Sequence, residues 1–244
     1  MDDIKVIDLD ETDSTNSFLR EYRGDEGRRM TVAVAKYQTS GRGQGTNSWE
    51  SERGKNLTFS VKTRPKGVPA NRQFVLLEAM ALAVRDVLSA YADCITIKWP
   101  NDIYWRDRKI SGTLSECGVG KGMVNGCIIG TGININQTVF TSDAPNPVSL
   151  RQITGRETSV KEVLGKVTTH FMALLGRIDA GGYDDIHNAY LAALYRRSGS
   201  FKYRDNGGEF TGVIETVEPN GHLLLRKDNG GVGEYAFKEV EFLL

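Results

Sequence analysis

The sequence predicts an α/β body followed by a small all-β domain, and two observations support this fold class. Up to about residue 195, short stretches rich in β-branched residues alternate with stretches of helical periodicity. After Arg197 no helical period remains, and short apolar segments alternate with turn sequences such as Asp-Asn-Gly-Gly, found at 205–208 and again at 228–231. We therefore expect a body over residues 1–195 and a β domain over residues 196–244.

The first half of the body is expected to hold three strands, one short helix and one long helix. The strands are predicted at 5–9, 32–35 and 57–61, and the polar residues 13–16 are suited to cap a short helix through Leu19. The clearest helix covers 69–91, where apolar residues recur at intervals of three and four along one stripe. A stripe of this kind predicts a helix that packs on the core.

The second half begins with strands and ends with two helices. Strands are predicted at 94–99, where Pro100 stops the strand, and at 103–105 and 124–129. A further strand should start near Gly112. Ser159 and Glu162 have the spacing of a capping box, which opens a helix to about 178, and a second helix is expected over 184–195. In the β domain, strands at 210–217, 222–225 and 235–237 favour a barrel of about five strands.

Charge is balanced over the whole chain but not along it. Lys and Arg total 31, and Asp and Glu also total 31, so no net field draws the protein onto nucleic acid or an anionic membrane. Residues 36–67, however, hold seven bases and two acids in a glycine-rich stretch. A solvated basic surface is one interpretation; the glycines favour another, in which backbone N–H groups approach an anion.

The sequence shows no export or membrane signal. The longest apolar run, 189–195, is far shorter than the roughly 20 residues that span a bilayer, and the N-terminus is acidic where a signal peptide is basic. Three cysteines without a CxxC motif argue against a disulfide framework and fit a reducing cytoplasm, with Cys117 and Cys127 expected to be small buried hydrophobes.

Covalent catalysis and a fixed metal site are not indicated. The three histidines, at 170, 187 and 222, show neither HxH nor HxxxH spacing, and no serine lies in a GxSxG elbow.

A glycine-rich loop joins two of the predicted strands. It contains Arg42, Gly43 and Gln44, but it lacks the Gly-Lys-Ser/Thr ending of a P-loop and the third glycine of a dinucleotide fingerprint. Trp49 follows, and its flat face could cover an aromatic ring or simply pack. The loop alone is weak support for anion binding. Its position between two strands strengthens the case for an anion site.

The densest polar cluster runs from Lys98 to Asp102 at the end of a strand. Pro100 and Asn101 are ordinary turn formers, so a purely structural turn is one interpretation. Lys98 near a carboxylate suits an anionic ligand with or without a divalent ion. Downstream, the strand at 128–136 ends in two glycines and two asparagines; Asn134 and Asn136 would share a face if the strand continued, or would mark an edge with a bulge.

These segments, in this order and spacing, resemble the catalytic domain of the biotin–protein ligases, also called holocarboxylase synthetases. The resemblance rests on Asp-Ser-Thr-Asn at 13–16, Gln38, Ser-Gly-Arg-Gly at 40–43, Trp49, Lys-Trp-Pro-Asn-Asp-Ile at 98–103, Lys109, Gly112 and Gly-Thr-Gly-Ile-Asn-Ile-Asn at 130–136. It implies a mixed, largely antiparallel sheet with helices, like that of class II aminoacyl-tRNA synthetases, and a C-terminal SH3-like β-barrel.

The resemblance also implies a reaction in two steps. Biotin would attack the α-phosphate of MgATP to give biotinyl-5′-AMP, and a lysine of a biotin carboxyl carrier protein would then take the acyl group. Because AMP carries the acyl group, such an enzyme needs cations, backbone N–H groups and Mg²⁺ more than a nucleophile of its own. This agrees with the lack of histidine and cysteine chemistry.

The site residues follow from the resemblance, position by position. Catalytic roles fall to Arg42, Lys98, Asp102 and Lys109, with Lys98 expected at phosphate and Asp102 beside the carrier lysine or Mg²⁺; no fixed metal site is expected. The biotin contacts are Ser14, Thr15, Asn16, Gln38, Arg42, Gly43, Gln44, Lys109, Gly112 and Gly130. The ATP and adenylate contacts are Arg42, Trp49, Asn101, Lys109 and Asn134.

One departure and three alternatives accompany this interpretation. Gln44, Gly45 and Asn47 stand where arginines are frequent in the family, so this loop is less cationic. The first alternative is a lipoate–protein ligase, which shares the fold and the chemistry. The second is a ligase–repressor, which would need a DNA-binding domain, and the roughly 13 residues before Ser14 leave no room for one. The third is a non-catalytic binding module. We expect a carboxylase biotin domain as partner, no nucleic acid, no membrane, a possible homodimer through a sheet edge, and a cytoplasmic location.

Overall fold

The body is built on a seven-stranded mixed sheet. The computed structural model describes residues 3–24, 27–43, 45, 47–142 and 145–243. The strand order is β1-β2-β3-β7-β6-β5-β4, in which only β1 and β2 run parallel. The strands are β1 (Ile4–Thr12), β2 (Met30–Gln38), β3 (Leu57–Thr63), β4 (Ile95–Lys98), β5 (Asp102–Trp105), β6 (Arg108–Gly120) and β7 (Met123–Ile133).

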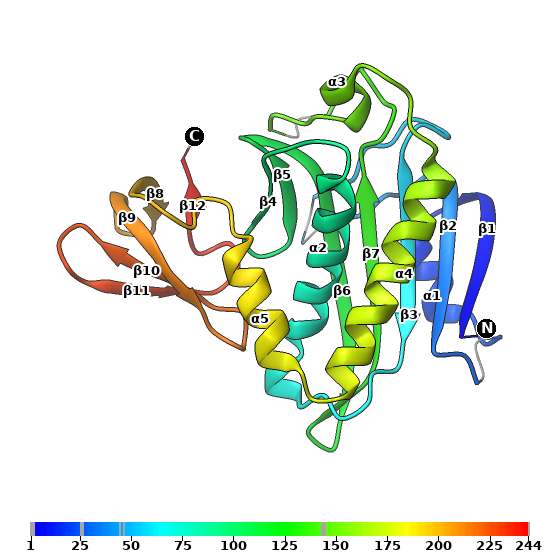
Figure 1. The fold of residues 1–244 in the computed structure, drawn as a ribbon, viewed down its shortest axis with the longest axis horizontal. Coiled ribbons are helices and arrows are strands. Elements are labelled where there is room, and N and C mark those ends of the chain that lie inside the picture. The colour runs from blue at the N-terminus through cyan, green and yellow to red at the C-terminus, as the bar shows by residue number, and fades with distance from the viewer. Residues whose placement is uncertain (1–2, 25–26, 44, 46, 143–144, 244) are drawn as a thin grey trace.

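Helices cover both faces of this sheet. Figure 1 shows α2 (Phe74–Ser89), α4 (Val160–Asp179) and α5 (Tyr183–Ala192) in front of the sheet and α1 (Thr15–Glu21) behind it. Most of α2 is buried, not only its predicted stripe, because α5 and α4 lie on either side of it in front of the sheet and pack against it (Figure 1). The long helix starts later than expected, at Phe74, and the predicted first turn is a separate 3₁₀ turn, Ala70–Arg72.

The C-terminal part forms a second, antiparallel sheet of five strands in the order β11-β10-β9-β8-β12, which agrees with the expected SH3-like domain. Its strands are β8 (Phe201–Asp205), β9 (Gly208–Val217), β10 (Leu223–Lys227), β11 (Val232–Tyr235) and β12 (Glu241–Phe242). Backbone bonds from Ile97 N to Ala193 O, 2.9 Å, and from Tyr195 N to Ile97 O, 2.8 Å, join the chain before this sheet to β4. The small sheet therefore lies beside the β4 edge of the body (Figure 1).

One helix and two strands had no counterpart in the sequence prediction. The short α3 (Leu150–Thr154) has a complete capping box, in which Ser149 Oγ accepts from Gln152 N and Gln152 Oε1 accepts from Ser149 N. β12 has two residues, which are too few for a period to emerge, so only its pairing partner reveals it. β8 has five residues in which apolar Phe201 and Tyr203 alternate with polar ones, a strand pattern that the prediction did not include.

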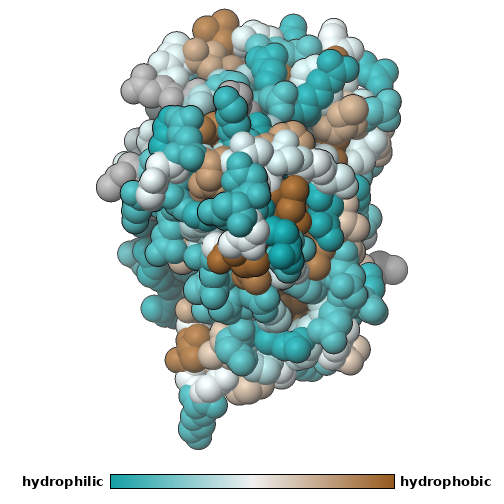
Figure 2. Space-filling model, turned by 90° about the vertical axis from the view of Figure 1, so that its left-hand side faces the viewer, coloured by the Kyte–Doolittle hydropathy of each residue, from teal (hydrophilic) through white to brown (hydrophobic). Residues whose placement is uncertain are grey.

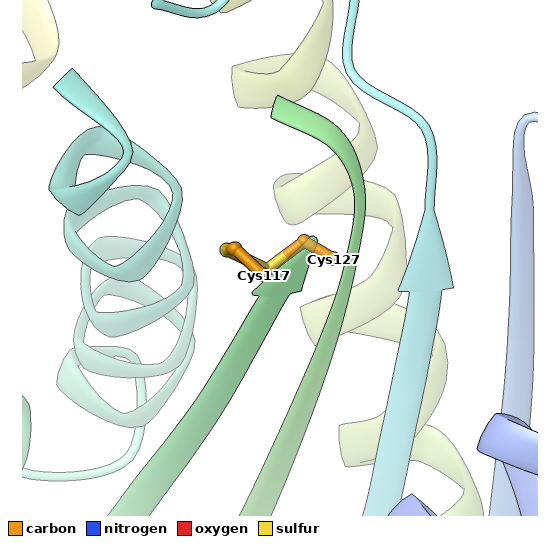
Figure 3. Close-up of a disulfide and its surroundings, with 2 residues drawn as sticks. All are labelled: Cys117 and Cys127. Carbon is orange, nitrogen blue, oxygen red and sulfur yellow. A yellow bond between two sulfur atoms is a disulfide. The ribbon is translucent and has the colours of Figure 1, made fainter. Parts of the chain in front are cut away.

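The expectation for the cysteines was wrong in two respects: Cys117 is only partly buried, although Cys127 is buried, and the two are not separate thiols. Cys117 and Cys127 are joined by a disulfide that links β6 to β7 (Figure 3). The two residues lie directly opposite each other in the antiparallel register, and their Cα atoms are 4.1 Å apart. Facing positions of a hairpin bring side chains this close, which spacing along the chain does not reveal. Cys94 is a free, exposed cysteine.

The surface is mostly polar on the side of the small sheet. Figure 2 shows hydrophobic side chains there as small groups scattered among hydrophilic ones. Within the described part of the chain, no helix has the length and apolarity needed to cross a membrane.

Candidate functional site

A cavity of about 940 Å³ lies against the large sheet and reaches the small one. Every predicted site residue that the structure describes lines it. These are Ser14, Thr15, Asn16, Gln38, Arg42, Gly43, Trp49, Lys98, Asn101, Asp102, Lys109, Gly112, Gly130 and Asn134. Gln44 lies outside the described residues. The motifs are far apart in the sequence, and the pairing of β3, β7 and β6 brings them together.

One end of the cavity is lined by buried, uncharged polar groups. Ser14, Thr15 and Asn16 begin α1 and are at most 4% exposed. The Thr15 N–H donates to Gln38 Oε1 at 2.8 Å, and Thr15 Oγ1 lies 2.6 Å from Ser60 Oγ. Ser60 in turn donates to Asn16 Oδ1 at 2.5 Å.

This network differs from the expected helix cap and leaves one donor unused. Ser14 occupies the N-cap position of α1 but makes no capping bond. Asn16 Nδ2 is buried without a hydrogen-bond partner among the described residues. An unpaired buried amide costs free energy, so such a group is typical of a site that completes its bonds with a ligand.

Three glycines keep the sheet surface open beneath the cavity. A Cβ at Gly130 would collide with the Asn16 amide, and a Cβ at Gly132 would collide with the Trp49 indole. A Cβ at Gly112 would lie 3.2 Å from Lys109 Nζ and 3.3 Å from Asp102 Oδ1. Gly112 and Gly130 were expected as biotin contacts, whereas the contact between Gly132 and Trp49 was not expected.

The charged part of the cavity holds a lysine–carboxylate pair. Lys109 Nζ lies 2.7 Å from Asp102 Oδ2, and both side chains are about a quarter exposed. The backbone of Lys109 is held on both sides, because its N–H donates to Asn146 O and its carbonyl accepts from Val148 N. The pair is thus firmly placed where β5 and β6 meet.

Lys98 lies on the other side of Asp102, under the small sheet. Its ammonium group lies 5.0 Å from the ring centre of Tyr104 and 5.3 Å from that of Phe242, in cation–π geometry. Burial lowers the pKa of Lys98, Asp102 opposes this shift and Lys109 adds to it. A partly desolvated cation of this kind favours an anionic ligand.

Asn101 and Asn134 line the cavity, but the protein already uses their amide N–H groups. Asn101 donates to Thr113 O, and Asn134 donates to Val148 O at 3.2 Å. Asn134 Oδ1 is buried without a partner among the described residues and remains an acceptor for a ligand. Asn136 does not share this face: β7 ends at Ile133, and Asn136 pairs instead with the backbone of Thr158.

Arg42 lies at the rim and not over the cavity. Its guanidinium donates to Ser17 Oγ, and its backbone forms a bridge with Ser48 that closes the glycine-rich loop. Across the loop, Gly43 N donates to Asn47 O at 2.7 Å. The loop therefore holds the one arginine of the predicted site within reach of the polar end.

Several lining residues escaped the sequence analysis because distant segments contribute them. The small sheet and the turn before β12 supply Phe237, Lys238, Val240, Glu241 and Phe242. Glu50 and Phe140 also line the cavity, and buried Ser60 supports its polar end. A lone phenylalanine or serine has no motif, so only its place in the fold reveals it.

Comparison with known proteins identifies the family. A family model described as "Biotin/lipoate A/B protein ligase family" matches residues 9–134. The biotin–[acetyl-CoA-carboxylase] ligase of Paracoccus denitrificans is 31% identical over 234 residues, which cover 91% of this chain and 94% of that protein. The chain belongs to the biotin/lipoate A/B protein ligase family.

Other members of this ligase family match most of the length of the chain. The bifunctional ligase/repressor BirA of Bacillus subtilis is 28% identical, and the match covers 92% of this chain and 70% of that protein. The biotin protein ligase of Aquifex aeolicus, solved in complex with biotin and ATP, superimposes with a TM-score of 0.78 at 27% identity and covers 97% of each chain. The fold of this ligase, with its mixed sheet and C-terminal antiparallel sheet, is that of a biotin protein ligase.

Proposed function

We propose that this ligase activates biotin with ATP to give biotinyl-5′-AMP and transfers the biotinyl group to a lysine of a biotin carboxyl carrier domain. The observation that supports this most strongly is one continuous cavity with buried uncharged polar groups at one end and the Lys109–Asp102 pair at the other. Its relatives named as biotin–[acetyl-CoA-carboxylase] ligases agree with this assignment.

The polar end suits the urea ring of biotin. That ring has a carbonyl oxygen and two N–H groups, which need donors and acceptors placed close together. Asn16 Nδ2 is a free buried donor, and Thr15 and Ser14 offer hydroxyl oxygens beside it. The dithiolane of lipoate is almost apolar and would leave Asn16 unpaired, at a cost of about 1–3 kcal/mol. We therefore favour biotin over lipoate.

In the first step the biotin carboxylate attacks the α-phosphorus of ATP, an acyl–phosphate bond forms, and pyrophosphate leaves. Two anions must approach each other, so the protein has to offset their repulsion. Lys109 is placed to do so, and Asp102 holds its ammonium group in one position. Lys98, under the small sheet, would contact the phosphates. Arg42, at the rim, would close over the carboxylate.

In the second step the amine of the carrier lysine attacks the acyl carbonyl and AMP leaves with the bonding electrons. The attacking amine must lose a proton, and Asp102 is the carboxylate nearest to Lys109 in the cavity. Its acceptance of that proton would free Lys109 to stay with the departing AMP phosphate. Exclusion of water favours this step over hydrolysis of the mixed anhydride.

Mg²⁺ fits the site as an ion that arrives with ATP. Among the described residues no three His, Cys, Asp or Glu side chains gather to hold a metal ion. Mg²⁺ in nucleotide sites is usually held by substrate phosphates and one or two carboxylates, and Asp102 can supply one. The bound ion would neutralise charge on the phosphates as pyrophosphate leaves.

We further propose a carboxylase biotin domain as partner and the cytoplasm, where ATP is made and used, as location. A homodimer could form along β1, the outer strand of the sheet, where Val6 is 48% exposed. Nucleic acid and membrane are not among the proposed partners, because the chain carries no net charge.

The proposal is tested by the transfer of labelled biotin to a carrier domain in the presence of MgATP. We expect wild type to transfer the label and Lys109→Ala to do so at least about 100-fold more slowly, because a fixed charge opposite the reacting anions is lost. Lys161→Ala, which removes an exposed lysine of α4 far from the cavity, is the matched control and should retain wild-type rates.

Two outcomes would contradict parts of the proposal. A wild-type protein that transfers no biotin would refute the function, whereas transfer that is insensitive to Lys109→Ala would refute only the role of this lysine. Exchange of labelled pyrophosphate into ATP, measured with biotin and with lipoate, decides between the two acids. We expect exchange with biotin alone.

A further inference from the structure

Glu50 holds a segment from another part of the chain over the cavity. It follows Trp49 directly, and its carboxylate accepts hydrogen bonds from two consecutive backbone N–H groups. Thr141 N lies 3.0 and 3.1 Å from its two oxygens, and Ser142 N lies 2.8 Å from Oε2. Thr141 Oγ1, at 3.2 Å, and Gln137 Nε2, at 3.0 Å, also donate to Oε1.

The group that receives these bonds is suited to the task. An ionised carboxylate has two oxygens that only accept hydrogen bonds, and every partner here is a donor. The carboxylate therefore satisfies all of these donors at once. Burial alone would raise the pKa of Glu50, but the hydroxyl and backbone donors of Ser142 and Thr141 outweigh it and hold the pKa below its usual value. The carboxylate is therefore charged near neutral pH.

Two buried amides fix the base of this arrangement. Gln137 and Asn56 are each 2% exposed, and Asn56 Nδ2 donates to Gln137 Oε1 at 2.6 Å. Gln137 Oε1 also accepts from Glu52 N at 2.9 Å, while Asn56 Oδ1 accepts from Ile135 N at 3.0 Å. Side chains thus join the segment between Trp49 and β3 to the segment that follows β7.

The held segment brings an aromatic ring to the cavity. Phe140, Trp49 and Glu50 all line it, and Trp49 packs against Gly132 on the sheet. Apolar packing does little to hold the segment itself: Thr141 and Ser142 are exposed and Val139 is 68% exposed. Its position therefore depends on the hydrogen bonds to Glu50 more than on burial.

We propose that Glu50 is a positioning residue for the nucleotide: it fixes residues 137–142 so that Phe140 and Trp49, which the family resemblance implies as an adenylate contact, form the walls of the part of the cavity that would take the adenine, called here the adenine end. This inference rests on the proposed function, and it extends the site to a residue that contacts neither reacting group. Without the carboxylate, two backbone N–H groups lose their acceptor and the segment moves away from Trp49. ATP then binds a less preorganised site.

The test separates ATP binding from biotin binding. We expect Glu50→Ala to raise the Kd and the KM for ATP about tenfold and to leave the Kd for biotin within about twofold, because only the adenine end is displaced. Glu50→Gln keeps one acceptor but turns an amide donor toward the N–H groups, so it should weaken ATP binding nearly as much. Glu52→Ala, which removes an exposed carboxylate two residues away, is the matched control and should match wild type.

Melting temperatures distinguish a local effect on ATP binding from a general loss of stability. Glu50→Gln should melt within a few degrees of wild type. An ATP Kd unchanged in both Glu50 variants would overturn the inference, as would equal losses of ATP and biotin affinity. ATP affinity is measured by calorimetry without turnover. A wild type that binds ATP but transfers no biotin would therefore refute the proposed function and leave the Glu50 comparison valid.

Discussion

Gly130 and Gly132, two residues apart on β7, leave room for two different parts of the site. Gly130 faces the Asn16 amide, and Gly132 faces the Trp49 indole. The need for glycine is steric at both positions, since neither has a positive φ. A methyl group at either position should therefore move one side chain of the cavity and leave the strand itself intact.

This contrast predicts that two neighbouring substitutions have opposite selectivity. Gly130→Ala should displace Asn16 and weaken biotin at least about tenfold, while Gly132→Ala should displace Trp49 and weaken ATP by a similar factor. Gly126→Ala on the same strand is the control, because its Cβ would lie 3.8 Å from its nearest neighbour, an ordinary contact. Calorimetric Kd values for the two substrates check this, and equal effects of both variants on both substrates would contradict it.

Among the helices, α4 begins at a capping side chain that the sequence predicted. Ser159 caps α4, the 20-residue helix on the front of the sheet, because its Oγ accepts from Glu162 N at 3.2 Å. The first N–H groups of a helix have no partner within it, and a serine supplies one. This cap lies away from the cavity lining, so it contributes to stability alone.

Ser159→Ala should lower the free energy of unfolding by about 1 kcal/mol. Ser159→Asp should recover most of that loss, because aspartate caps as well as serine. Urea denaturation at pH 7 measures both variants, and the biotin transfer rate should stay at the wild-type value. A full loss of activity in Ser159→Ala would show that α4 supports the site more directly than its position indicates.

At the scale of the whole molecule, one buried pair connects the helices to the small sheet. Glu78 on α2 is 1% exposed, and its carboxyl lies 2.7 Å from Nδ1 of His187 on α5. Burial raises the pKa of Glu78, although His187 opposes this shift. The hydrogen bond to Glu78 raises the pKa of His187, and the backbone of Val217 in β9 adds to it.

Both shifts make the folded protein bind more protons than the unfolded chain. Stability from this pair is therefore complete at acidic pH and is lost as the pH rises through the raised pKa values, from above 4.5 for Glu78 and above 6.5 for His187. Between pH 5 and 8 the free energy of unfolding of wild type should fall, and Glu78→Gln should flatten this slope.

Urea unfolding at pH 5, 6.5 and 8 measures the slope. His222→Gln, in an exposed pair of the small sheet with Glu234, is the control and should keep the wild-type slope. Stability of Glu78→Gln that falls with pH as steeply as in wild type would show that other groups cause the dependence.

The site was predictable to the extent that its residues belong to local motifs. Lys109, Asp102, Thr15 and Gln38 were all expected at the site from such motifs, and all line one cavity. Glu50 was counted only as an acid in a basic stretch, because its function depends on Thr141 and Ser142, about 90 residues away. No local sequence pattern indicates a hydrogen bond between residues so far apart in the chain.

The amino-acid sequence alone determined where most strands and the long helices lie along the chain, the turns of the C-terminal sheet and the chemistry of the cavity. It could do so because periodicity, capping and motif spacing act over a few residues. Only the tertiary structure decided which distant groups meet: Cys117 with Cys127, Phe242 with Lys98, and Glu50 with Ser142. Each of these contacts depends on strand register and on the packing of one sheet beside another. Those are properties of the folded chain, and they arise when apolar side chains from distant segments are buried together.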